Sequence, residues 1–191
     1  MTNHDQDRAA ETFGRNAAKE KQAAAMLLTT PGKPFVYQGE ELGYYGRKSG
    51  GDEYVRTPIL WDKAGKDCAK KGVNGRVDTG MLTSSMSVEA QTADEGSLLN
   101  VYKAWSRLRN TYPALAEGTM TDAGLSGGSS IAAWYMTSGG EKMLVIHNVA
   151  SSEKSVTVKD DLSRPVALLG SATLDHDILS LSGHSSVVFK L

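Results

Sequence analysis

The residues near the start of the chain could carry the most chemistry. Asn3, His4 and Asp5 place an amide, an imidazole and a carboxylate side by side, and Arg8 follows closely. Side chains of these types donate and accept hydrogen bonds, transfer protons and pair with charge in catalytic clefts. Such a group is typical of the point where a buried strand reaches a cleft, yet only two residues precede it. We therefore expect this chain to be the C-terminal part of a larger enzyme.

The other candidate reactive residues form no recognisable motif. His147, His176 and His184 lack the spacing of zinc ligands, and Cys68 has no partner for an intrachain disulfide. The order of residues leaves a Ser-His-Asp triad open, but no G-x-S-x-G segment would place its nucleophile. The glycines of segment 43–51 fit neither the phosphate-loop nor the dinucleotide pattern, which favours a mobile surface loop. We expect no bound cofactor in this chain.

Several aromatic residues lie close together in the sequence, between positions 37 and 61. Their rings could stack on the faces of sugars, and the alternative is that half or more of them pack in the core. The residues concerned are Tyr37, Tyr44, Tyr45, Tyr54 and Trp61.

The composition is ordinary for a globular protein. At 191 residues, with 40% hydrophobic and 23% charged residues, the chain can hold one medium domain or a small domain and part of another. A net charge of -1 gives no general attraction to nucleic acid or anionic membrane, so we expect no nucleic-acid partner. No run approaches the ~20 apolar residues of a membrane span, so no membrane-spanning segment is expected.

The elements that would position these residues begin with a helix. Segment 15–30 is rich in Ala, Lys, Glu and Leu, which are strong helix formers, and Pro31-Gly32 would end the helix. Segment 34–38 has β-favouring residues and predicts a short strand. Helix, turn and strand together predict one αβ unit of a parallel sheet.

A second helix is predicted after a long irregular stretch. Segment 43–96 has many polar residues and glycines and only short apolar patches, which is typical of functional loops. Segment 97–111 has a clear amphipathic stripe, and Pro113 ends it. The stripe consists of Leu98, Val101, Tyr102, Trp105 and Leu108.

The last part of the chain has the pattern of an antiparallel sandwich. Segment 138–141 predicts a hairpin, and the alternation within 187–191 predicts a sheet covered mainly on one face. We place the domain boundary near Ala116. The predicted strands are 131–136, 143–149, 155–158, 166–169, 178–181 and 187–191.

In this order the segments resemble the C-terminal part of the α-amylase family of glycoside hydrolases. Asn3-His4-Asp5 resembles the motif at the end of the family's seventh barrel strand. Segment 32–43 resembles its eighth-strand pattern G-x-P-x-x-Y-x-G-x-E. Segment 56–61 resembles R-x-P-M-x-W, with Ile59 where the family often has Met. The family's final barrel helix, with the residues that lead to it, is similar to segments 87–91, 97–100 and 108–115.

The resemblance implies an α+β chain in which residues 1–116 complete a (β/α)8 barrel and residues 117–191 form an antiparallel β-sandwich. It implies a retaining mechanism with a carboxylate nucleophile and a carboxylic acid, both on strands outside this sequence. By resemblance Asp5 is the third carboxylate, which favours the distorted, positively charged transition state. His4 and Asn3 would bind the same sugar, and Arg8 would orient the acidic patch.

The resemblance therefore predicts part of an α-glucosidic hydrolase acting on starch-like glucans or malto-oligosaccharides. The chain by itself should be inactive, and calcium is a ligand to consider only for the complete parent. An extracytoplasmic location would suit a polysaccharide-degrading parent. The alternative is a non-catalytic carbohydrate-binding or interaction module that keeps the sandwich. Linkage specificity and oligomeric state are left open.

Overall fold

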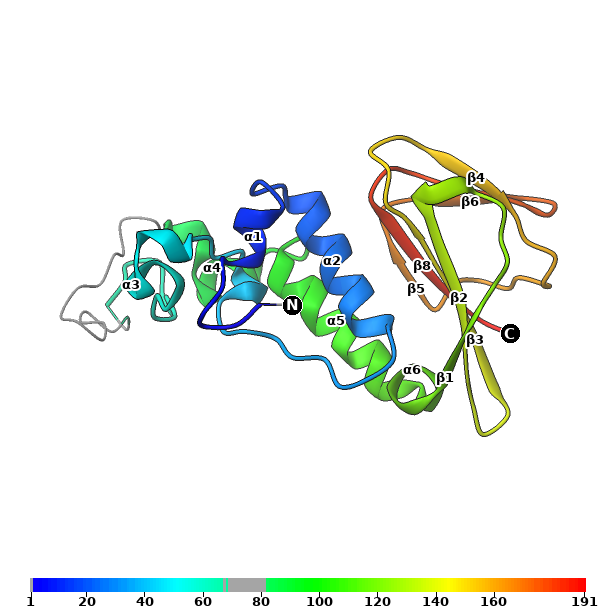
Figure 1. The fold of residues 1–191 in the computed structure, drawn as a ribbon, viewed down its shortest axis with the longest axis horizontal. Coiled ribbons are helices and arrows are strands. Elements are labelled where there is room, and N and C mark those ends of the chain that lie inside the picture. The colour runs from blue at the N-terminus through cyan, green and yellow to red at the C-terminus, as the bar shows by residue number, and fades with distance from the viewer. Residues whose placement is uncertain (1, 67, 69–81) are drawn as a thin grey trace. The chain divides into compact units, whose positions relative to one another are not determined.

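The computed structural model describes residues 2–66, 68 and 82–191. The chain divides into two compact units. The first unit comprises residues 1–20 and 34–103, and the second comprises residues 21–33 and 104–191. Two longer helices, α2 (Ala17–Thr29) and α5 (Leu98–Thr111), contribute residues to both units (Figure 1). In the described part of the chain, no helix is long and apolar enough to cross a membrane.

Both predicted helices are confirmed, and local capping explains where they begin. The Oδ1 atom of Asn16 accepts hydrogen bonds from the N–H groups of Ala18 and Lys19, each at 3.1 Å, at the start of α2. The hydroxyl of Ser97 accepts from Asn100 N at 3.2 Å at the start of α5. Such side-chain oxygens satisfy main-chain donors that have no partner inside the helix.

The first unit otherwise contains short helices and loops. The helices are α1 (Ala9–Thr12), α3 (Asp52–Val55) and α4 (Val88–Ala93), with 3₁₀ helices η1 (Glu40–Leu42), η2 (Lys48–Gly50) and η4 (Ser84–Met86). Their core is formed by the buried side chains of Leu42, Tyr44, Leu60, Cys68 and Leu99.

The predicted strand at 34–38 is wrong. The structure has no strand there, and the side chains of Phe35 and Val36 are 80% and 42% exposed. A parallel strand needs neighbouring strands to bond its main-chain groups. All described strands lie between Thr119 and Lys190 and pair antiparallel with one another, so this segment has no partner in its own unit and the predicted αβ unit does not form.

Steric constraints explain why a glycine follows this segment. Gly39 has a φ of 82°, in the left-handed region that glycine tolerates best. A Cβ atom at this position would collide with the ring of Tyr44. That ring is fully buried, and its hydroxyl accepts a 2.7 Å hydrogen bond from Leu60 N. Gly39 therefore allows the turn to fold tightly over the core of the first unit.

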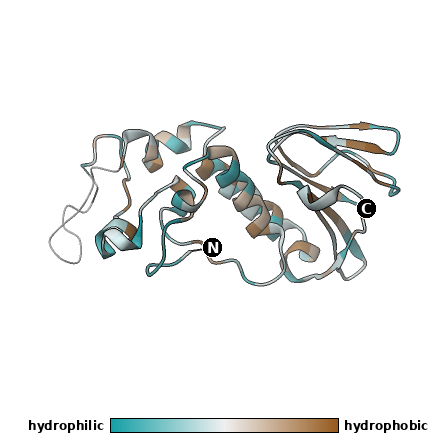
Figure 2. Cartoon of the chain, turned by 45° about the horizontal axis from the view of Figure 1, so that its top comes forward, coloured by the Kyte–Doolittle hydropathy of each residue, from teal (hydrophilic) through white to brown (hydrophobic). Residues whose placement is uncertain are grey.

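The second unit contains the predicted antiparallel sandwich. Its strands form two sheets (Figure 1). One sheet has the order β1-β2-β3-β8-β5 and the other the order β4-β7-β6. The strands are β1 (Thr119–Asp122), β2 (Ile131–Ser138), β3 (Glu141–Asn148), β4 (Lys154–Thr157), β5 (Ala167–Leu169), β6 (Ala172–Asp175), β7 (Ile178–Leu181) and β8 (Ser185–Lys190). α6 (Pro113–Glu117) precedes β1. Hydrophobic residues lie along parts of several strands of this unit (Figure 2).

Sequence pattern located most of the sandwich. The hairpin at 138–141 is confirmed, and Gly139 and Gly140 have the positive φ values, 56° and 85°, that such tight turns favour. β1 and β6 were not predicted. Both are edge strands with largely exposed residues, so neither has the alternation that marks a half-buried strand.

The expectation that the sheet is covered mainly on one face is wrong at β8. All residues from Ser185 to Phe189 are buried. Val187 and Phe189 join the core between the two sheets. The other face is covered because α2 packs on this sheet: Trp134 Nε1 donates to the Thr29 carbonyl at 3.3 Å.

Candidate functional site

The predicted site residues at the start of the chain form a turn. The N–H of Asp5 donates to Oδ1 of Asn3 at 2.8 Å, and Gln6 N donates to the Asn3 carbonyl at 3.4 Å. Because the segment turns instead of running extended, adjacent side chains can meet. His4 Nε2 lies 3.1 Å from Asp5 Oδ2, and both side chains are more than half exposed. Asn3 therefore shapes the turn that presents His4 and Asp5.

Two cations from a later segment contact the Asp5 carboxylate. Arg56 Nη2 donates to Oδ1 of Asp5 at 3.0 Å, and Lys48 Nζ lies 3.5 Å from the same oxygen. Desolvation acts to raise the pKa of Asp5, but His4, Lys48 and Arg56 outweigh it, so this pKa lies below its ordinary value. The arrangement favours the ionised form of Asp5, and only an ionised carboxylate carries the negative charge that stabilises a developing positive charge.

A second carboxylate balances these cations. Asp52 accepts from Lys48 Nζ through Oδ1, and its Oδ2 lies 2.9 Å from Arg56 Nη1. The hydrogen bond from Lys48 is the main cause of the lowered pKa of Asp52, and the same bond raises the pKa of Lys48. The structure thus brings two carboxylates and two cations together around the predicted motif.

Sequence reasoning missed Lys48, Asp52 and Arg56. Their spacing of four residues with alternating charge is a usable signal, because such residues share one face of a helical segment. Arg56 also opens the segment that resembles R-x-P-M-x-W. The loop expected at 43–51 therefore contributes a contact to the site through Lys48, where η2 begins.

Arg8 lies in the core of the first unit. Its side chain is 1% exposed and donates to the Gln38 carbonyl and to Thr57 Oγ1, the latter at 3.2 Å. Its guanidinium carbon lies 4.6 Å from the ring centroid of Tyr37 and 5.6 Å from that of Tyr44. Burial lowers the pKa of Arg8. These contacts tie the start of the chain to the segment 37–57 and do not involve Asp5.

The aromatic residues divide between packing and exposure. Tyr44 is fully buried, Tyr37 donates to the Val55 carbonyl at 3.0 Å, and the guanidinium carbon of Arg15 lies 3.7 Å from the ring centroid of Tyr45. Trp61 is 56% exposed and has the most open aromatic ring of the group. The packing interpretation therefore holds for Tyr44, while Trp61 offers a face that a sugar could use.

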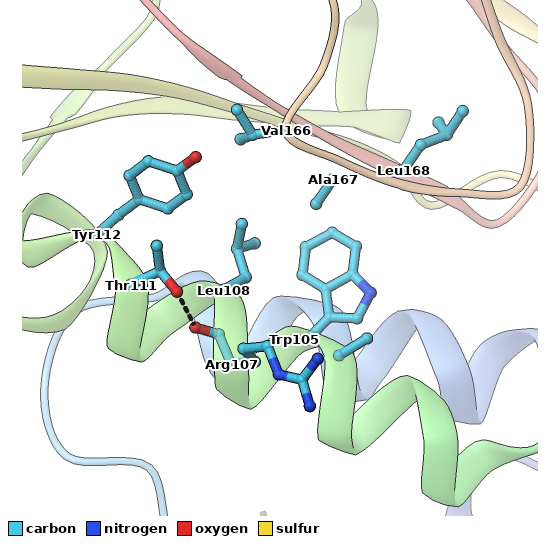
Figure 3. A pocket seen from close by; sticks show the side chains of 9 residues that line it. Trp105, Arg107, Leu108, Thr111, Tyr112, Val166, Ala167 and Leu168 are labelled. Atoms are coloured by element: carbon cyan, nitrogen blue, oxygen red, sulfur yellow. Dashed lines mark hydrogen bonds between the residues drawn. The ribbon is translucent and has the colours of Figure 1, made fainter.

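The second unit has a separate cavity of about 380 Å³ between α5 and the segment around β5 (Figure 3). Trp105, Leu108 and Tyr112 line it from α5 and the residue after it, opposite Val166 and Leu168. Trp105 is only 4% exposed, so its ring is part of the core. The cavity is mainly apolar and contains no carboxylate.

Within 2–66, 68 and 82–191, no group of three or more His, Cys, Asp and Glu side chains is arranged to hold a metal ion. Calcium binding by a complete parent stays a prediction.

Comparisons with known proteins identify both parts of the chain. Residues 1–118 match the family model described as "Alpha amylase, catalytic domain", and residues 131–188 match "Alpha-amylase SusG C-terminal domain". Alpha-amylase SusG of Bacteroides thetaiotaomicron is 43% identical over an alignment with all of this chain and 28% of that protein. Alpha-amylase 3 of Dictyoglomus thermophilum is 28% identical over all of this chain and 38% of that protein.

A solved structure titled "Eubacterium rectale Amy13B" is similar to this chain, with a TM-score of 0.82 and 30% identity. It is matched over 99% of this chain and 38% of its own length. The chain thus spans well under half the length of the proteins it resembles.

Proposed function

Because the chain belongs to the α-amylase family of glycoside hydrolases, we propose that it forms part of a retaining enzyme that hydrolyses α-glucosidic bonds in starch-like glucans. The α+β architecture, with antiparallel sheets in its C-terminal part, agrees with the family's solved structures. The observation that carries the proposal is the Asp5 carboxyl group, held in a turn and paired with Arg56 within the matched catalytic segment. An α-glucan or malto-oligosaccharide is the proposed partner.

The residues of this chain take supporting parts in the proposed reaction. Asp5 favours the oxocarbenium-like transition state, whose positive charge a carboxylate stabilises. His4 and Asn3 bind hydroxyl groups of the same sugar. Arg8 supports the site indirectly, because its buried guanidinium joins the motif to Gln38 and Thr57. The nucleophile and the general acid belong to strands outside this sequence.

We also propose that the catalytic domain ends near Ala116 and that residues 117–191 form the C-terminal domain. The matched family segments support this boundary, since one ends at residue 118 and the other begins at residue 131. In this chain most of α2 and the end of α5 belong to the same compact unit as the sandwich.

Kinetics of the complete protein test the function. The purified chain alone should release no reducing sugar from starch, because a two-carboxylate mechanism needs both of its carboxylates. In the complete enzyme, Asp5→Asn should lower kcat by about 10²–10³ with a smaller change in KM. Asp161→Asn, a change at an exposed carboxylate of the second unit, is the control. Normal turnover by Asp5→Asn would refute the assignment.

The alternative, a non-catalytic carbohydrate-binding module, finds less support. The cavity of Figure 3 is a hollow of the second unit that could take a sugar. Sugar-binding platforms need an open aromatic face, and the ring of Trp105 is buried. Calorimetric titration of the chain with maltoheptaose distinguishes the two functions: binding abolished by Tyr112→Ala would favour the module.

A further inference from the structure

Arg56, which the sequence pattern did not mark as a site residue, contacts both His4 and Asp5 of the predicted site. Its Nε donates to the main-chain carbonyl of His4 at 3.1 Å, and its Nη2 donates to Asp5 Oδ1 at 3.0 Å. We propose that Arg56 is the positioning residue that orients the Asp5 carboxylate for the reaction. This inference rests on the proposed function and assigns a new role within the same site.

The guanidinium suits this role because its donors form a rigid, planar fork. One side of the fork binds the turn at His4 and Asp5, and Nη1 on the other side lies 2.9 Å from Asp52 Oδ2. A lysine ammonium is a point charge on a flexible stem and could not hold three oxygens in fixed directions. Arg56 therefore sets both the position and the direction of the Asp5 carboxylate.

The neighbouring backbone fixes the location of Arg56 relative to the motif. Arg8 N donates to the Gly46 carbonyl at 3.0 Å, and Lys48 N donates to Asp7 Oδ1 at 2.7 Å. Thr57, the next residue after Arg56, is 1% exposed and accepts from Arg8. The segments 4–8 and 46–57 are thus joined at several points, and the Arg56 contact is part of a built arrangement.

Exposure argues against a purely stabilising role for the Arg56–Asp5 pair. The Asp5 side chain is 59% exposed and that of Arg56 is 27% exposed. Ion pairs this open to solvent add little to the stability of a fold. The ion pair is therefore better suited to orienting a carboxylate than to holding the fold together.

The first experiment uses the chain itself and needs no activity. The Asp5 carboxyl is titrated by NMR in the unmodified chain, Arg56→Gln and Arg47→Gln. Arg56→Gln removes one of the cations beside Asp5 and should therefore raise the Asp5 pKa. The charged or titratable groups that remain around Asp5 are His4, Lys48 and Asp52. Arg47 pairs with Glu11 at 2.8 Å, so Arg47→Gln should leave this pKa unchanged. An unchanged titration in Arg56→Gln overturns the proposal.

The second experiment uses the complete enzyme. Arg56→Gln should lower kcat by ~10²-fold with little change in KM, since a misplaced group loses much of its effect on the transition state. Arg56→Lys should recover only part of this loss, and the melting temperature should barely change. An inactive Asp5→Asn together with a fully active Arg56→Gln overturns this inference alone. An active Asp5→Asn overturns the proposed function.

Discussion

The side-chain amide of Gln22 on α2 donates to the main-chain carbonyl of Asn148 on β3 at 2.7 Å, across 126 positions of sequence. The same amide donates to the Ser185 carbonyl at 3.1 Å, and Gln22 Oε1 lies 3.2 Å from His184 Nδ1. Gln22 is 4% exposed. One buried side chain therefore joins a helix of the catalytic segment to strands of the sandwich within a single compact unit.

We predict that Gln22→Ala destabilises this unit. The substitution leaves two buried carbonyl oxygens without this donor, and an unsatisfied buried polar group costs about 1–3 kcal/mol. Denaturant unfolding followed by circular dichroism measures the loss. Lys19→Ala, at an exposed position of the same helix, is the control. Equal stabilities of the two variants would contradict the prediction.

We predict that the free energy of unfolding decreases as the pH is lowered, because of His147. Burial lowers the pKa of this imidazole to about 3, and its Nδ1 and Nε2 lie 2.7 Å from Ser186 Oγ and 3.2 Å from Thr29 Oγ1. In the unfolded chain the pKa is about 6.5. Between these values the unfolded state binds more protons, so the contribution is complete above about pH 6.5 and is lost as pH falls towards 3.

The limiting slope for this single group is about 1.4 kcal/mol per pH unit. His147→Asn should flatten the dependence of the unfolding free energy on pH in this window. His176→Asn should not, because the side chain of His176 is 92% exposed. Identical slopes in unmodified protein and His147→Asn would show that another group causes the acid sensitivity.

We predict that Arg8→Met lowers stability and leaves the pKa of Asp5 unchanged. The buried guanidinium donates to Gln38 and Thr57, and its loss should cost about 1–3 kcal/mol. Asp5 is held by Arg56 and Lys48 instead. Chemical denaturation and NMR titration measure the two quantities, with the exposed Arg107→Met as control. A raised Asp5 pKa with unchanged stability would support the role that the resemblance implies for Arg8, which is to orient the acidic patch.

We predict fast hydrogen exchange at Val36 and slow exchange at Val145. Val36 lies in a segment without strand pairing, and Val145 lies in β3 between β2 and β8. Main-chain groups in a central strand exchange only when the sheet opens. Hydrogen exchange of a verified monomer, read by mass spectrometry, compares the two sites. Comparable protection would mean that residues 34–38 pair as a strand after all.

Local signals in the amino-acid sequence were sufficient to predict the two longer helices, the hairpin and the candidate site. Helix α2 forms within segment 15–30 because that segment is rich in helix formers, and α5 forms within segment 97–111 because of its amphipathic stripe. A side-chain cap lies at the start of each helix. The hairpin at 138–141 forms because two glycines accept positive φ. The turn at Asn3 to Asp5 was selected as the candidate site because polar, titratable residues of those types are adjacent.

The partners of these elements depend on the tertiary structure. Residues 34–38 have the composition of a strand but no neighbour to pair with, and β8 is buried on both faces because α2 covers one of them. Arg8 is buried, and Arg56 reaches Asp5 across 51 positions of sequence. Propensity and periodicity act over a few residues, whereas burial and ion pairing depend on distances between segments that only folding brings together.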